Sequence, residues 1–207
     1  MNLVKLASHT VDLDLLPERP VVLDVGCRGF DFTREVLALR PKAYVLALDP
    51  DPLMEYPHET ENDWVYMRAA LVGDDRKTAN YACWSTGEGN MLCEVSPHYA
   101  ERSHQVKCIN IGRLSSTFNV DRWDLVKLDC EESEFGILEA WPGPIATQIS
   151  VEFHDWTGPW ETKAKNSPTY YPNLWAGPLR DYEVVQHELS KVGEGVGHWD
   201  TLLRLKR

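Results

Sequence analysis

A short apolar run that ends in a glycine turn constrains the fold of this chain more than any other feature. Residues 21–26 are mostly apolar, and the turn that follows contains Gly26 and Gly29. A helical pattern comes next, and a second apolar run, residues 43–48, ends in Asp49. Strand, glycine turn, helix and strand, closed by a carboxylate, is the arrangement that binds a cofactor carrying a nucleoside.

The same alternation continues through the rest of the chain. Apolar runs typical of buried strands cover residues 21–26, 43–48, 64–72, 123–129 and 147–153. Apolar side chains at helical spacing predict helices over residues 31–40 and 131–141. Strands that alternate with helices favour an α/β fold whose parallel strands are joined by right-handed crossovers.

The tail of the chain differs from this pattern. Two further strands are expected at residues 182–188 and 198–206, joined by a glycine-bearing turn. They predict an antiparallel hairpin at the C-terminal edge of the sheet.

The length of 207 residues suits a single domain with one substantial core. We expect residues 1–20 to be an N-terminal extension and residues 74–111, with their scattered glycines, to form hairpins or loops. Residues 156–178 are rich in Trp, Tyr and Pro and lack a clean period, which indicates an insertion or a lid. Their aromatic rings either form a wall for an acceptor or cover one edge of the sheet.

Composition excludes several classes of partner. The formal net charge of -11, without a dense cluster of Lys and Arg, argues against nucleic acid. The five cysteines show no spacing typical of a zinc site or a redox motif, and we expect reduced thiols in a cytoplasmic protein. No apolar run approaches eighteen residues, so we expect neither a signal peptide nor a membrane span. The oligomeric state stays open.

The glycine turn indicates which cofactor the site prefers. Asp24 stands where a dinucleotide fingerprint has its first glycine, and a carboxylate is awkward beside a diphosphate. It suits the amino group of S-adenosyl-L-methionine, whose carboxylate can bind Arg28 or the helix N-terminus. Asp49 can accept hydrogen bonds from both ribose hydroxyls. The alternative is that Asp and Gly simply favour a turn here. The expected cofactor-binding residues are Asp24, Gly26, Cys27, Arg28, Gly29, Asp49, Pro50 and Ala70.

Longer motifs resemble the FkbM family of S-adenosylmethionine-dependent methyltransferases. Residues 124–134, DLVKLDCEESE, are similar to its Lys-hydrophobic-Asp-x-Glu-Gly-x-Glu signature, and residues 151–154, VEFH, to its Glu-x-His. The acidic segment 47–52 also resembles the family. The resemblance implies a doubly wound, mostly parallel seven-stranded sheet and methyl transfer to an oxygen of a sugar or other small natural product. Here the glycine turn is one residue shorter, and Glu132 stands where the family has Gly.

Three residues are candidates for acid and base chemistry on an acceptor. Asp129, Glu131 and His154 follow two predicted strands at the edge where open α/β sheets bind ligands, with His154 the better base near neutral pH. The alternatives are a structural histidine and a glutamate that stabilises a helix N-terminus. Asp129, Glu131, His154, Glu152 and Asp155 also offer ligands for a divalent cation, a possibility that we do not favour.

Two other functions remain open. The chain could be an NAD-dependent oxidoreductase, although Asp24 and the incomplete glycine set count against it. It could also be a non-catalytic module that binds the cofactor or a partner. We expect a small-molecule or glycan acceptor, no nucleic acid and no membrane.

Overall fold

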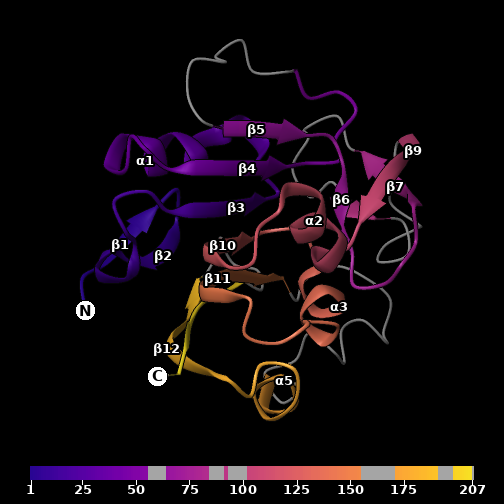
Figure 1. The fold of residues 1–207 in the computed structure, drawn as a ribbon. Helices are drawn as coiled ribbons and strands as arrows, with labels where there is room; N and C mark the ends of the chain where they lie inside the picture. Colours follow the sequence, from indigo (N-terminus) through magenta and orange to yellow (C-terminus); the bar gives the residue numbers. More distant parts are fainter. Residues whose placement is uncertain (56–63, 84–90, 93–101, 155–170, 191–197, 207) are drawn as a thin grey trace.

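The computed structural model describes residues 1–55, 64–83, 91–92, 102–154, 171–190 and 198–206 (Figure 1). Asp155, most of the aromatic segment 156–178 and the expected tail turn therefore lie outside the described residues.

Seven strands form the main sheet, in the order β12-β13-β11-β10-β3-β4-β5 (Figure 1). Neighbouring strands from β11 to β5 are parallel, and β12 and β13 add an antiparallel edge. The strands are β3 (Val21–Val25), β4 (Tyr44–Leu48), β5 (Trp64–Met67), β10 (Trp123–Leu128), β11 (Ala146–His154), β12 (Tyr182–Ser190) and β13 (His198–Leu205). The predicted mostly parallel, seven-stranded sheet with a C-terminal hairpin is confirmed.

Helices cover both faces of this sheet, but they are few. Helix α1 (Asp31–Leu39) shares one face with a hairpin of β1 (Leu3–Leu6) and β2 (His9–Asp12). Helices α2 (Ile111–Phe118) and α3 (Glu134–Glu139) pack on the other face. In the described ranges the doubly wound arrangement is therefore only partly present, because a hairpin takes the place of a helix on one face.

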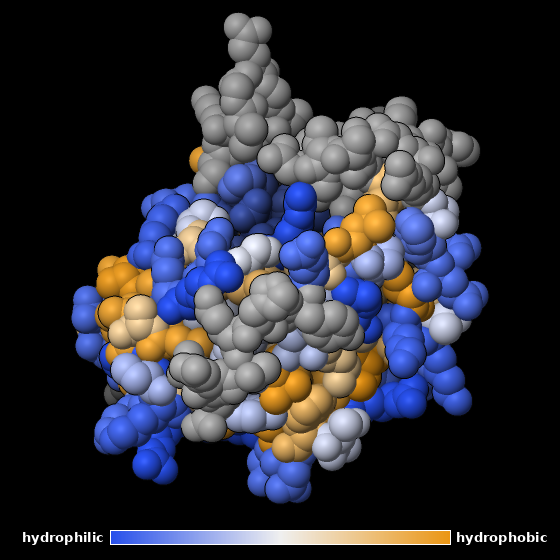
Figure 2. Space-filling model, turned by 90° about the horizontal axis from the view of Figure 1, so that it is seen from above, coloured by the Kyte–Doolittle hydropathy of each residue, from blue (hydrophilic) through white to orange (hydrophobic). Residues whose placement is uncertain are grey.

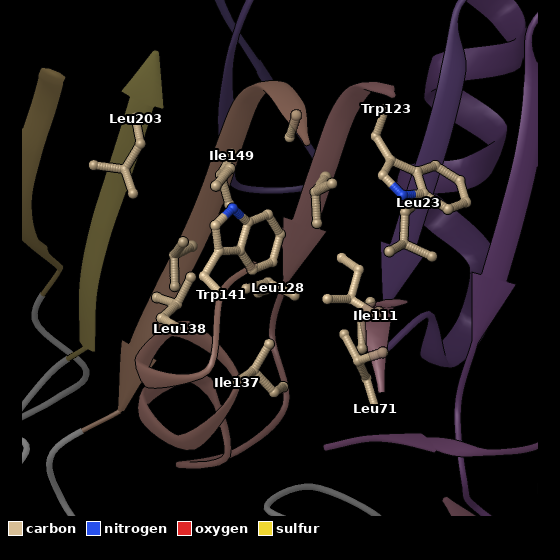
Figure 3. Packing of buried hydrophobic residues seen from close by; sticks show 14 of the residues in the cluster. Leu23, Leu71, Ile111, Trp123, Leu128, Ile137, Leu138, Trp141, Ile149 and Leu203 are labelled. Atoms are coloured by element: carbon tan, nitrogen blue, oxygen red, sulfur yellow. The ribbon is translucent and has the colours of Figure 1, made fainter. Parts of the chain in front are cut away.

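The core lies between the sheet and α2 and α3. Alternate residues of β3 face opposite sides, so that Leu23 packs in this core and Val22 packs beneath α1. Figure 3 shows the large ring of Trp141 beside Leu128 and the ring of Trp123 beside Leu23. Both Leu23 and Trp123 are fully buried.

Three sequence-based boundaries need correction. The run 64–72 is split into β5 and the short β6, which belong to different sheets. The helix expected over 131–141 begins only at Glu134, because Glu131 and Glu132 both have positive φ and cannot continue a right-handed helix. Helix α2, which the sequence analysis did not predict, follows the side-chain cap of Asn110 on the N–H of Arg113.

A second, smaller sheet occupies the expected hairpin region. Its strands are β6 (Ala70–Leu71), β7 (Thr78–Cys83), β8 (Met91–Leu92) and β9 (Arg102–Ile109), in the order β6-β9-β7-β8. It lies beyond the carboxyl ends of the central strands of the main sheet (Figure 1). The remaining elements of the described ranges are the short helices η1 (Leu13–Leu15), η2 (Arg28–Phe30) and α5 (Tyr171–Ala176).

Among the described residues, no helix has the length and hydropathy needed to cross a membrane. The face seen in Figure 2 mixes hydrophilic and hydrophobic residues, and exposed large apolar side chains such as Leu53 and Val184 come from separate elements.

Candidate cofactor and acceptor site

One cavity of about 290 Å³ lies where the carboxyl ends of β3, β4 and β10 meet the small sheet. Its volume is near the lower end of the range of about 300 to 1,000 Å³ typical of ligand sites. The lining residues are Ala7, His9, Asp24, Val25, Gly26, Cys27, Arg28, Asp31, Phe32, Asp49, Pro50, Ala70, Leu71, Tyr81, Leu92, Lys127, Asp129, Cys130, Glu131 and Ser133. All predicted cofactor-binding residues except Gly29 line it, as do Asp129 and Glu131.

The glycine turn after β3 is shaped by a close approach to β10. Gly26 has a φ of 75°, and a Cβ at this position would lie 1.7 Å from the carbonyl oxygen of Asp129. Its N–H donates to the oxygen of Leu48 over 2.8 Å. Gly29 also has a φ of 75°, but its carbonyl binds Arg34 and it does not line the cavity. Only glycine fits at position 26, which fixes the backbone at the floor of the cavity.

The carboxylate of Asp24 is balanced by neighbouring side chains of the protein. One carboxylate oxygen lies 3.3 Å from Nζ of Lys127, and the other accepts a hydrogen bond from the Thr33 hydroxyl over 2.7 Å. The ammonium of Lys127 also donates to the Gly26 carbonyl over 2.6 Å and lies 3.5 Å from Asp129. Burial opposes the charge of Lys127, but Asp24 and Asp129 outweigh burial and raise its pKa. Contact between Asp24 and a cofactor amino group stays a prediction.

Asp49 lies at the end of β4 with only 4% of its surface exposed. One carboxylate oxygen accepts the N–H of Asp51 over 2.9 Å. Burial raises the pKa of Asp49 to about 6, although the Asp51 N–H opposes the shift. Burial therefore disfavours the ionised form of Asp49 at the cavity wall, and a carboxyl group with such a perturbed pKa is typical of a binding residue.

Asp129, at the end of β10, faces three cationic or imidazole groups. Its Oδ2 lies 3.5 Å from both Lys127 Nζ and His9 Nε2, and its Oδ1 lies 3.9 Å from His154 Nε2. Burial raises the pKa of Asp129, but Lys127 and then His9 outweigh it, so the pKa is lowered overall. A carboxylate with a lowered pKa is a weak base, and Asp129 is better suited to hold a positive charge or to orient a hydroxyl.

Glu131 follows in a left-handed conformation, with a φ of 52°, and Glu132 has a φ of 71°. Position 132, where the FkbM family has Gly, thus has a backbone conformation that favours glycine. Burial raises the pKa of Glu131 to about 7, with a smaller opposing contribution from His154. The strained turn places this carboxyl beside the cavity, where it can exchange a proton near neutral pH.

His154, at the end of β11, is enclosed by carboxylates and does not line the cavity. Its Nδ1 lies 3.3 Å from Glu134, and its Nε2 lies 3.3 Å from Glu152 and 3.6 Å from Glu131. Burial lowers the pKa of His154, but these carboxylates, Glu134 first, raise it well above its usual value. A raised pKa makes His154 a weaker proton acceptor near neutral pH, and its role as the better base stays a prediction.

Several residues of the site escaped the sequence analysis. His9, on β2, is 2% exposed and reaches the cavity from the N-terminal hairpin, and Tyr81 reaches it from the small sheet. Lys127 stood inside a predicted strand without an assigned role. The one local signal for such a role was a lysine in the middle of a mostly apolar run, because a buried lysine requires a carboxylate partner.

The cysteines near the cavity are not nucleophiles. Cys27, Cys83, Cys108 and Cys130 carry free thiols. Burial raises the pKa of Cys27 and Cys130, which keeps both thiols protonated at neutral pH.

Trp175, from the predicted aromatic segment, packs edge-on against Phe153 at 6.2 Å and so covers the sheet.

No known protein family and no curated protein sequence matches the chain. Solved structures do. A methyltransferase FkbM from Methylobacillus flagellatus superposes with a TM-score of 0.53 at 11% identity, over 94% of this chain and 46% of that chain. A Listeria monocytogenes protein described as an S-adenosylmethionine-dependent methyltransferase gives 0.49 at 13% identity, over 94% and 95%. Human N-acetylserotonin methyltransferase, solved with SAM, gives 0.42 at 14% identity, over 95% and 49%.

At these identities a superposition is evidence of a shared fold alone, and only the first of these three, with a TM-score above 0.5, provides it. The chain therefore shares a fold with the Methylobacillus protein, of which it spans less than half the length.

Proposed function

We propose that the chain is an S-adenosylmethionine-dependent methyltransferase that methylates a hydroxyl of a sugar or other small metabolite. The observation that carries the proposal is that Asp49 and the glycine turn, two separate sequence features, line one cavity at the carboxyl ends of parallel strands. Open α/β sheets bind nucleoside cofactors in this place. The shared fold with a methyltransferase supports the same function.

The residues present fit this cofactor. The carboxylate of Asp49 can accept hydrogen bonds from the two ribose hydroxyls, and Arg28 at the cavity wall can bind the cofactor's carboxylate. The cofactor contains no phosphate, so the carboxylates around the cavity do not oppose it. A dinucleotide would place its diphosphate close to Asp24 and Asp49.

When bound, the cofactor supplies a sulfonium methyl group. This methyl group would pass to the acceptor oxygen, and a nearby base would take the hydroxyl proton. Because Asp129 and Glu131 line the same cavity, we propose that Asp129 orients the hydroxyl and that Glu131 accepts this proton. The chain itself needs no nucleophile.

Ligand-induced stabilisation tests the cofactor assignment. S-adenosylhomocysteine at 100 times its dissociation constant is expected to raise the free energy of unfolding by about 2.7 kcal/mol. Asp49→Ala should remove most of this gain, while Asp121→Ala, an exposed control, should retain it. A shift with NAD and none with either adenosyl compound would overturn the proposal in favour of an oxidoreductase.

The acceptor atom needs a second measurement. Transfer of a labelled methyl group from the cofactor to a panel of sugars, phenols and amines should label hydroxyl compounds. Labelling confined to amines would refute O-methylation and leave the cofactor assignment intact.

A further inference from the structure

We propose that His9, Asp129 and Glu152 form a binding site for a first-row divalent cation beside the cavity. The three side chains come from β2, the end of β10 and β11, and their donor atoms lie within 4.8 Å of one another. Cation binding is independent of the proposed function, whereas any part of the ion in catalysis rests on it.

The geometry of His9 is the main argument. Its Nε2 lies 3.5 Å from Asp129 Oδ2 and 3.9 Å from Glu152 Oε2. Although both carboxylates are this close, the buried Nε2 makes no hydrogen bond to any described residue. A buried imidazole nitrogen that lies within 4 Å of two carboxylates without a hydrogen bond of good geometry to either is suited to bind a cation between them. Ligands bonded to one ion at about 2.1 Å lie roughly 3 to 4 Å apart, so little movement is needed.

The ligands are held by a second layer of contacts. The other ring nitrogen of His9 lies 3.5 Å from the Ser150 hydroxyl, and the ring packs edge-on against Phe32. Glu152 uses its other oxygen, Oε1, to contact His198 Nδ1 at 3.0 Å, which leaves Oε2 facing His9. Such outer contacts fix the orientation of metal ligands.

Charge also favours a cation here. Six carboxylates lie in a connected group that also contains the ammonium groups of Lys5 and Lys127 and the imidazoles of His9, His154 and His198. The carboxylates are Asp24, Asp129, Glu131, Glu134, Glu152 and Asp200. Three of the group's buried carboxylate oxygens, Oδ1 of Asp24, Oε2 of Glu131 and Oε2 of Glu134, make no hydrogen bond within the described part of the chain. A divalent cation would offset this excess of negative charge in a partly buried place.

The donor set identifies the class of ion. One imidazole nitrogen with two carboxylate oxygens suits manganese, iron or zinc better than calcium or magnesium, which prefer oxygen alone. Because Asp129 lines the cavity, such an ion would lie close enough to polarise an acceptor hydroxyl.

Binding of Mn²⁺ to the full chain, freed of metal with a chelator, tests the site. Electron paramagnetic resonance should show one bound ion per chain, with a spin-echo modulation from one imidazole nitrogen. His9→Ala and Glu152→Gln should each weaken binding at least 10-fold. His187→Gln is the matched control, because His187 binds Thr201 and stacks on Trp199 instead, and it should leave the affinity unchanged.

No binding at about 1 mM Mn²⁺, weaker than most protein sites, would overturn the proposal. So would binding that lacks the nitrogen modulation or that survives His9→Ala. The spin-echo measurement uses the unsubstituted chain, so it stands even if a variant does not fold. Stabilisation by S-adenosylhomocysteine is measured separately without metal, so the failure of either proposal is distinguishable from the failure of the other.

Discussion

Asp49 offers a sharp test of the candidate cofactor site, because the structure holds its carboxylate at a cost. The shift in its pKa from 3.8 to about 6 corresponds to about 3 kcal/mol, at about 1.4 kcal/mol per pKa unit. A group whose folded-state pKa is raised in this way destabilises the fold when ionised. The penalty is fully present above pH 6 and disappears as the pH falls below 3.8.

Asp49→Asn removes this charge and keeps an oxygen that can accept the N–H of Asp51. We expect the variant to be more stable than the parent by about 3 kcal/mol at pH 8. The gain should shrink to about 1 kcal/mol at pH 4.5, where most of the folded parent is protonated at this position. The same variant should lose much of the stabilisation by S-adenosylhomocysteine, because a neutral amide accepts hydrogen bonds from ribose less strongly.

Urea denaturation at pH 4.5, 6 and 8 measures the gain, with tryptophan fluorescence as the signal. Asp121→Asn is the control, since its exposed side chain should change stability by less than about 0.5 kcal/mol. A gain that does not depend on pH would refute the assignment of the cost to ionisation. A loss of stability at pH 8 would show that the carboxylate stabilises the fold.

Two further substitutions test the framework of the site. Position 132 has a φ of 71°, so Glu132→Gly should be more stable than Glu132→Ala by about 1 kcal/mol in thermal unfolding. Position 35, within α1, is the control, and there Glu35→Ala should be more stable than Glu35→Gly. Equal stability of the two variants at 132 would mean that the turn relaxes. Lys127→Met leaves two carboxylates without their ammonium, so urea denaturation should show a loss of about 3 to 5 kcal/mol in the free energy of unfolding. A loss below about 1 kcal/mol would show that Lys127 is not coupled to these carboxylates.

The sequence predicted the parts of the fold that depend on local pattern. The central strands are apolar runs buried on both faces, so β3, β4 and β10 could be placed within about a residue, together with Asp49 and Asp129 at their ends. Helix α3 was placed too early, because helical spacing of apolar side chains says nothing about backbone handedness at Glu131 and Glu132.

The protonation of the site could not be predicted, because it depends on groups brought together by the fold. His154 is separated by twenty residues from Glu134 and by only two from Glu152, yet both carboxylates lie 3.3 Å from its ring. Sequence spacing indicates which residues share an edge of the sheet, but not how many charges surround one of them. The surroundings of His154 and Glu131 could therefore be described only once these distances were known.

The N-terminal hairpin contributes to the candidate site in a way that the local sequence pattern could not predict. Asp12 and Gln148 exchange two hydrogen bonds, from the Asp12 N–H over 2.9 Å and from the Gln148 side chain over 3.1 Å, which attach β2 to β11. Val11 is fully buried in the same contact. This attachment directs His9 to the carboxyl ends of β10 and β11. The segment expected to be an extension thus contributes a wall of the cavity, and a chain without it would lack the one histidine that lines the cavity among the described residues.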